Sequence, residues 1–351
     1  MMVPFRQEAQ RLAADWGIHL PGVTHYATEP HSLSAMDDAS GTRPLPGIPD
    51  VLTTTIDPQV VRALVTPTRS EQIYGSGKKG DCTRRTMMFP EAESAGYVTP
   101  YGDYEPNGMA NTRINWVSRE SFYFQTWARY GDLDVQMLGL AGVALATEQR
   151  LAGATVLNKA SNKMNLFGIA GRALYGALND PRLPAAIQPT AKASPGGKGT
   201  VTSWTDTNDA IAVYGDFVSL FSQLTQQLAG QIDTETELVA VIPSERAPVL
   251  KYIVSYGLTL EDMLKKGFPN MVIRTLPEAG PSLSGGAQNV AMMQLFVPRL
   301  DGVDTVTTAF TEKLLMHRLE TYSSYMQQKM SQGGWGTIWR RPQACATMVG
   351  I

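Results

Sequence analysis

The sequence has few charged residues and few cysteines, and each shortage excludes some classes of protein function. Charged residues make up 18% of the 351 residues, against the ~25% usual for soluble domains; this fits a surface covered by partners and a slightly apolar monomer equally well. The formal net charge of −2 gives no overall basic field for nucleic acid. Cys82 and Cys345 lie outside any CxxC spacing, which predicts neither a disulfide framework nor a zinc site.

Long hydrophobic runs are also absent. The uncharged run MLGLAGVALA at 137–146 has ten residues, whereas a membrane-spanning helix needs ~20. The N-terminal MMVPFRQEAQRLAADWG has neither the apolar core nor the small-residue cleavage site of a signal peptide. We therefore expect no membrane segment. From the two isolated cysteines we also expect a protein that folds in the reducing interior of a cell.

No catalytic motif is complete. The GSGKKG at 75–80 lacks the Ser or Thr that follows GK in a phosphate-binding loop, and it predicts a flexible basic turn before a strand. The GPSLS at 280–284 has Ser284 where a nucleophile elbow has its final glycine. The histidines match no metal-ligand spacing; they are His19, His25, His31 and His317. We expect no catalytic residues, cofactor ligands or metal ligands.

The first part of the chain has little regular patterning. Apolar residues at helical spacing predict a short amphipathic helix over 5–16, and PQVVRALVTP predicts another over 58–67. Between them, residues 17–55 are rich in Pro, Gly, Ser, Asp and Thr. A compact domain rarely contains ~30 residues without regular structure, so this segment is predicted to be disordered or to be an arm that lies on a neighbour.

The next segment is rich in β-branched and aromatic residues. It predicts strands at Arg84–Phe89, Gly96–Tyr101 and Thr112–Trp127, with a polar tip over Gly102–Asn111. The segments before the tip and the segment after it are predicted to pair as a long two-stranded ribbon. Because an isolated two-stranded ribbon is marginally stable in water, we expect this one to dock on another structure.

A single long helix is predicted from Leu133 to about Met164. Asp132 or Asp134 would be its N-cap, and Gly168 marks its end. At ~1.5 Å per residue it would be about 45 Å long, far longer than the mean helix of ~11–12 residues.

Residues 206–299 then alternate between helical and strand patterns and predict a second, α/β domain. Its helices are predicted at Asn208–Gly230, Ser244–Tyr256 and Leu260–Lys266, and its strands at Glu237–Pro243, Asn270–Thr275 and Val290–Val297. The final strands, predicted at Gly336–Arg341 and Ala344–Val349, would return to the first domain, which makes the α/β block an insertion.

Charged and aromatic residues of the ribbon and of the C-terminal segment are candidates for contacts between subunits. Arginine is favoured in interface ion pairs, and large aromatic side chains anchor interfaces. A solvated surface, or contacts within the ribbon itself, would account for the same residues. The candidates are Arg84, Arg85, Glu91, Glu93, Tyr101, Tyr104, Trp116, Arg340 and Arg341.

This order of parts resembles the major capsid proteins of tailed bacteriophages, which have the Hong Kong 97-type fold. The resemblance rests on residues 96–149, on NLFGIAGRALYGALNDP at 165–181 and on the closing GGWGTIWRRPQACATMVGI. It implies an α+β fold with an N-terminal arm, an E-loop β-ribbon, a spine helix, a peripheral domain and an inserted axial α/β domain. The implied boundaries are 1–56 for the arm, 57–83 for the start of the peripheral domain, 84–122 for the E-loop, 123–205 for the peripheral domain with the spine helix, 206–299 for the axial domain and 300–351 for the C-terminal return.

The resemblance implies a structural protein, not an enzyme, that self-assembles as hexamers and pentamers into an icosahedral shell around phage double-stranded DNA. Scaffold, portal and decoration proteins would be further partners, and the virion, assembled in the host cytoplasm, would be its location. An encapsulin-like nanocompartment shell, or a soluble enzyme using residues 206–299, are the alternatives. Some relatives cross-link the E-loop through a lysine; since no lysine lies between Lys79 and Lys159, we expect no such bond from the tip of this E-loop.

Overall fold

A computed structural model of the chain describes residues 68–101, 103, 108–140, 144–194, 200–207, 209–254, 257–281 and 290–351, without the side chains of residues 92–94 and 206. The chain divides into two units, Met1–Val60 and Val61–Ile351, and every described residue belongs to the second. The helices predicted at 5–16 and 58–67 and the arm at 17–55 lie outside the described residues.

The first sheet has four strands in the order β1-β12-β13-β4. The strands are β1 (Ser76–Lys78), β12 (Val306–Thr321), β13 (Tyr325–Trp339) and β4 (Phe122–Gly131). β13 is antiparallel to both of its neighbours, and β1 runs parallel to β12. The flexible turn predicted at 75–80 is therefore wrong, because the backbone of residues 76–78 pairs with the edge of β12.

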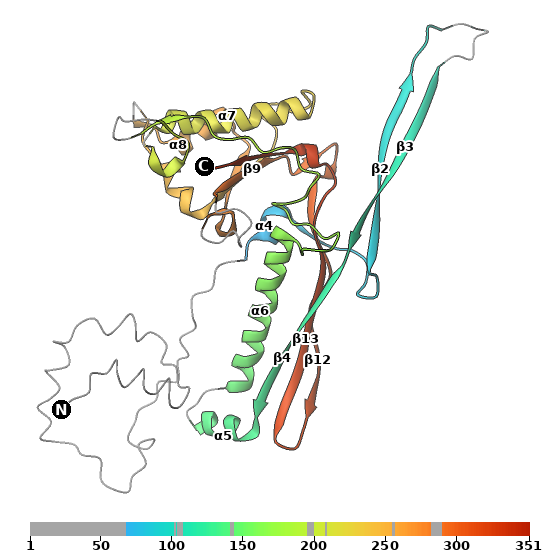
Figure 1. The fold of residues 1–351 in the computed structure, drawn as a ribbon, viewed down its shortest axis with the longest axis vertical. Helices are drawn as coiled ribbons and strands as arrows, with labels where there is room; N and C mark the ends of the chain where they lie inside the picture. The colour runs from blue at the N-terminus through green and yellow to red at the C-terminus, as the bar shows by residue number, and fades with distance from the viewer. Residues whose placement is uncertain are drawn as a thin grey trace, which may run out of the picture. The chain divides into compact units, whose positions relative to one another are not determined.

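Helix α6 (Leu145–Phe167) lies along this sheet, beside β4 and β13 (Figure 1). Its Leu157 is buried with Ala128 of β4 and Met330 of β13. The four carbonyls at the end of α6, of residues 164–167, all accept hydrogen bonds from the chain that follows, which satisfies the groups that a helix end leaves unpaired. The donors are the amides of Gly168, Ala177 and Leu178 and the side chain of Asn179, at 2.6 to 3.0 Å.

The single helix predicted from Leu133 to Met164 is wrong. The structure has α5 (Asp132–Leu140) and α6 as separate helices, and Ala144 before α6 has a ψ of 76°, outside the helical range. Glycines at 139 and 142 lower the helix propensity here. No side chain of α5 is buried, so no packing compensates for them.

The ribbon consists of β2 (Thr86–Tyr97) and β3 (Met109–Glu120), paired antiparallel from Thr86 opposite Glu120 to Tyr97 opposite Met109. The strands predicted at 84–89 and 96–101 therefore fall only partly on β2, and residues 98–101 are not in a strand. The strand predicted at 112–127 is divided at Ser121, whose amide and hydroxyl bond to the carbonyls of Arg85 and Arg84. At that point the chain stops pairing with β2 and begins to pair with β13 as β4.

The second sheet has the order β14-β9-β7-β8. Its strands are β7 (Leu238–Pro243), β8 (Met271–Leu276), β9 (Met292–Phe296) and β14 (Cys345–Val349), and α7 (Ala210–Gln227) and α8 (Leu260–Gly267) pack with it. Short elements complete the described part: β5 (Lys192–Ala193), β6 (Thr200–Val201), β10 (Arg299–Leu300), β11 (Val303–Asp304), η2 (Trp204–Asp206), η5 (Pro277–Ala279) and η6 (Pro342–Ala344).

Two predictions for this part of the chain are wrong. The helix predicted at 244–256 is the 3₁₀ helix η3 (Ser244–Lys251); Pro248 within it has no N–H to donate to an α-helical ladder. β14 pairs with β9 in the second sheet and does not return to the first. Its alternate residues Ala346 and Met348 are buried in the same core as α7, so the α/β unit takes its last strand from the C-terminus.

A shared core joins the two sheets. β7 is buried along its whole length: Leu238, Ala240 and Ile242 face the α7 side, whereas Val239 and Val241 belong to a second cluster with Trp339 at the end of β13. In that cluster Phe296 of β9 contacts Trp339, with ring centroids 5.6 Å apart, and Tyr74 of α4 (Ser70–Tyr74), with centroids 5.5 Å apart.

Candidate intersubunit surfaces

The base of the ribbon packs against the first sheet through apolar side chains. Met87 and Phe89 of β2 lie against a buried cluster of Ala309, Trp335 and Ile338 from β12 and β13. The indole of Trp335 donates to the carbonyl of Lys79, at 2.7 Å, just after β1 ends. The ribbon is therefore fixed to the body at one end.

Charged side chains add to this attachment. Arg119 of β3 donates to Asp180, in the turn after α6, at 2.5 Å, and both side chains are almost wholly buried. The Arg119 guanidinium also lies 4.7 Å from the centre of the Tyr175 ring. Burial lowers the pKa of Arg119, and the negative charge of Asp180 opposes that shift, so the pair compensates a charge that the interior disfavours.

Arg182 connects the same turn to the other strand of the ribbon. It forms an ion pair with Glu91 of β2, and it donates to the carbonyl of Trp339 at 2.5 Å. Its backbone amide donates to Asp180 at 3.0 Å. Each strand of the ribbon is thus held by one ion pair to residues 180–182.

The two faces of the ribbon differ. Side chains opposite one another in an antiparallel pair lie on the same face, so Met87, Phe89, Glu91, Val117 and Arg119 share the face turned to the body. The opposite face is exposed near the base and is largely apolar. It carries Met88, Pro90, Ile114 and Trp116, and Trp116 is 61% exposed.

The structure separates the candidate contacts on the ribbon. Arg84 and Arg85 are exposed just before β2, and their side chains have no hydrogen bond or ion pair with other described residues. Trp116 and Tyr101 are exposed, Tyr101 by 93%, and a hydrogen bond with Asp103 raises the pKa of Tyr101. The structure assigns Glu91 to an internal ion pair. Tyr104 and the side chain of Glu93 lie outside the described residues.

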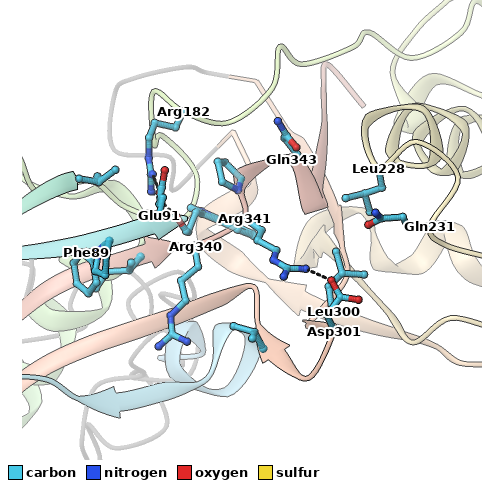
Figure 2. Close-up of a pocket in the computed structure, with 16 residues that line it drawn as sticks. Phe89, Glu91, Arg182, Leu228, Gln231, Leu300, Asp301, Arg340, Arg341 and Gln343 are labelled. Carbon is cyan, nitrogen blue, oxygen red and sulfur yellow. Dashed lines mark hydrogen bonds and ion pairs between the residues drawn. The ribbon is translucent and has the colours of Figure 1, made fainter. Parts of the chain in front are cut away.

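A cleft of about 1,040 Å³ lies between the ribbon base, the β10–β11 hairpin, η6 and the end of α7 (Figure 2). Arg340 and Arg341 both line it. Arg341 donates to Asp301 at 2.7 Å, whereas the guanidinium of Arg340 is directed away from Glu91 and has no acceptor among the described residues. The two adjacent arginines therefore differ in their availability to a partner.

Sequence reasoning missed the residues that anchor the ribbon, namely Arg119, Asp180 and Arg182. Arg119 gave no signal in the sequence, because the apolar alternation of this strand falls on Ile114 and Trp116, which the structure leaves exposed. Asp180 gave no signal either, because its neighbour in space is 61 residues away in the sequence.

The described residues contain no group of three or more His, Cys, Asp or Glu side chains arranged for a metal ion. Within the same residues, no helix combines the length and the hydrophobicity that crossing a membrane requires. His317 hydrogen-bonds to the buried Ser331 at 2.8 Å, and the other histidines lie outside the described residues. Cys82 is exposed and Cys345 is buried.

Comparisons with known proteins agree on one class. A family model described as Pa193 gp26 major capsid protein matches residues 39–350. The capsid of Myoviridae phage XM1 is similar in structure, with a TM-score of 0.69, 12% identity and coverage of 87% of this chain and 99% of the other. No curated protein sequence matches the chain.

Two further solved structures have the same fold. The capsid of the native GTA particle has a TM-score of 0.54 and 13% identity, and covers 84% of this chain and 95% of its own. A structure from Mycobacterium phage Ogopogo has a TM-score of 0.54 and 10% identity, with 84% and 96% covered. At these identities the structural likeness shows the fold alone.

The mixed α/β fold, with its projecting ribbon and its helix along a long sheet, is that of phage capsid proteins. The family match spans most of the chain, and the chain belongs to the family of Pa193 gp26 major capsid proteins. It is a structural protein of a tailed-bacteriophage capsid shell.

Proposed function

We propose that copies of this chain assemble as hexamers and pentamers into an icosahedral shell that encloses phage double-stranded DNA, and that the β2–β3 ribbon lies over a neighbouring copy. The observation that carries this proposal is the exposed apolar face of the ribbon. Met88, Ile114 and Trp116 lie on a two-stranded structure that is marginal in water by itself, and burial against a neighbour would remove their apolar surface from water.

The parts of the chain follow the Hong Kong 97-type plan in this proposal. The ribbon is the E-loop, α6 is the spine helix, the β1-β12-β13-β4 sheet belongs to the peripheral domain, and residues 206–299 with β14 form the axial domain. Residues 1–56 are the arm. Intersubunit contacts come from Arg84, Arg85, Tyr101, Trp116 and Arg340.

Mass action over many equivalent contacts would then stabilise the closed shell, with no chemical step. Scaffold, portal and decoration proteins would be further partners, and the virion the final location, after assembly in the host cytoplasm. Contact with DNA would be weak and nonspecific, since the sequence contains no long basic run and its net charge is −2.

Electron microscopy of the expressed protein tests the assembly. We expect closed shells from the wild-type chain and fewer shells from Trp116→Ser, because this change removes an aromatic anchor from the ribbon face. Val272→Ser is the control; this side chain is exposed on β8, away from the ribbon. A wild-type chain that stays monomeric at all concentrations, or equal loss of shells in both variants, would contradict the proposal.

Denaturing electrophoresis of purified shells tests the expected absence of a covalent bond from the E-loop tip. Single chains should be recovered after heating in detergent. A ladder of linked chains that disappears when residues 98–108 are replaced would contradict the expectation.

A further inference from the structure

Helix α5 presents an apolar stripe that is largely exposed. Leu133, Met137 and Leu140 are four and three residues apart, so they lie on one face of the helix, and they are 64%, 61% and 90% exposed. A helix shorter than ~12–15 residues is marginal in water unless tertiary packing supports it, and α5 has nine residues, none of them buried. Among the described residues, nothing covers this stripe.

The exposed face of the ribbon carries no charge from Met88 outward. Met88, Ile114 and Trp116 are each more than half exposed on it, whereas Arg113 lies on the opposite face. Without a cation this face offers nothing to the phosphates of DNA. It requires an uncharged partner surface, because a charge buried against it would lose its hydration without gaining a counter-ion. The described residues of this face are Met88, Pro90, Gly96, Ala110, Thr112, Ile114, Trp116 and Ser118.

The stripe and the ribbon face have similar lengths. The stripe spans seven residues of helix from Leu133 to Leu140, about 10 Å at ~1.5 Å per residue. On the ribbon, Met88 is four residues from Ala92, which lies opposite Ile114, and this is about 13 Å at ~3.3 Å per residue. The large apolar side chains of the two surfaces can therefore lie against one another along their whole length.

These two surfaces cannot meet within one chain. The ribbon ends at Glu120 and α5 begins at Asp132, and the ten-residue strand β4 runs between them, a separation of about 33 Å. The ribbon projects from one end of β4, and α5 lies at the other end (Figure 1). A contact between them is therefore made by two copies, and it is a head-to-tail contact of the kind that closes a ring.

Helix α7 offers a second uncharged apolar surface, but it fits the ribbon less well. Ile211 and Val218 are exposed on α7 and lie seven residues apart. This helix already buries an apolar face that includes Phe217 and Leu220. Since α7 is stabilised by its own core, it does not depend on a partner as α5 does.

We propose that the uncharged face of the β2–β3 ribbon in one copy packs on the Leu133–Met137–Leu140 stripe of α5 in a second copy. The proposal rests on the proposed shell function and names the surface that receives the ribbon. The contact removes apolar side chains of both elements from water. It also gives the short helix the packing that its own chain leaves out.

Disulfide trapping tests the contact between copies. One population of chains carries Cys82→Ser with Ile114→Cys, and a second, ¹⁵N-labelled population carries Cys82→Ser with Met137→Cys, so that no chain holds both new thiols. Shells assembled from equal amounts of the two are oxidised and analysed by mass spectrometry. Because a disulfide requires Cβ atoms ~3.5–4.5 Å apart, we expect mixed-isotope dimers joined between positions 114 and 137.

The trapping experiment has a matched control on α7. Ile211→Cys replaces Met137→Cys in the second population and should give no mixed-isotope dimer. A dimer through position 211 would identify α7 as the receiving surface and overturn the proposal. Absence of a dimer with Leu133→Cys, Met137→Cys and Leu140→Cys alike would overturn it as well, and would leave a different protein as the partner of the ribbon.

Charge variants give an independent readout. Ile114→Lys and Met137→Glu should each raise the subunit concentration required for half-maximal shell formation about tenfold, because each buries an unpaired charge. Combined in one chain, they should restore that concentration to within about threefold of the wild type, since the two charges then meet across the contact. Ile211→Lys, the control on α7, should assemble as the wild type does.

The outcomes separate this contact from the shell function. Unchanged assembly of both single variants, or no recovery in the combined variant, would refute the pairing of the ribbon with α5 while wild-type shells still support the shell function. If the wild-type chain forms no shells at any concentration, the shell function itself fails.

Discussion

The Arg119–Asp180 ion pair leads to the sharpest prediction about stability. The substitution Asp180→Asn keeps the size of the side chain but removes its charge. Arg119 would then keep a buried positive charge without its counter-ion, since the Arg119 side chain is only 3% exposed. Removing one partner of such a pair costs about 3–5 kcal/mol, because the remaining charge stays desolvated.

The measurement is urea-induced unfolding of unassembled subunits, followed by the fluorescence of the buried Trp335 and Trp339. With a slope of ~2–3 kcal/mol per molar urea, we expect the midpoint to fall by about 1–2.5 M. The matched control is Asp304→Asn. Asp304 pairs with Arg299 at 3.2 Å on the surface, with both side chains more than half exposed, and such pairs are worth ~0–1 kcal/mol.

A double variant separates loss of charge from loss of shape. Replacing Arg119 by Met and Asp180 by Leu removes both charges and should recover at least half of the stability, since apolar replacement of a buried pair is often neutral or better. If Asp180→Asn lowers the midpoint no more than Asp304→Asn does, the pair is solvated and the reasoning about the ribbon base is wrong.

Three further predictions follow from single sites. Burial raises the pKa of Glu278, so the folded state favours the protonated carboxyl; this stabilisation is fully present below the unfolded pKa and is lost as pH rises through the folded pKa. Glu278→Gln should therefore raise the Tm by about 2 °C at pH 7.5 and leave it unchanged at pH 4. An equal gain in Tm at both pH values would contradict this. Burial raises the pKa of Cys345 to about 12, so a thiol reagent at pH 8 should modify Cys82 alone until denaturant is added; two reactive thiols in the native chain would be inconsistent with this. Gly176→Ala would place a Cβ 2.1 Å from the backbone of Leu166 and should cost about 2 kcal/mol in urea unfolding; a wild-type midpoint would show that the turn can move.

The sequence predicted those elements whose pattern is local. ELVAVIP has no charged residue after Glu237 and is a strand buried on both faces, and α7 has apolar residues at helical spacing. The break between α5 and α6 was missed because the run of small and apolar residues is compatible with a helix. Whether one continuous helix forms depends on whether other parts of the protein pack against Leu133 to Leu140, and no local sequence pattern carries that information.

Pairing between distant segments was the least accessible to sequence reasoning. The pattern at 344–349 predicts a strand but not its partner, because an alternating strand fits the edge of either sheet. The same limit applied to the candidate contacts. Glu91 and Arg341 look as free as Arg84 and Arg340 in the sequence, yet their partners Arg182 and Asp301 are supplied by tertiary structure.

The way the ribbon is attached has a geometric consequence for a shell. Beyond Glu91, the last anchored residue of β2, the strand continues to Tyr97, which at ~3.3 Å per residue gives a lever about 20 Å long. A rotation of about 10° at Glu91 would move the tip by roughly 3.5 Å, about one residue along a neighbouring strand. Arg119 and Arg182 hold the two strands separately to residues 180–182, so they resist this rotation more effectively than a single contact would. Weakening either ion pair should therefore broaden the range of positions that the tip can reach, even where the exposed contact residues at the tip are unchanged.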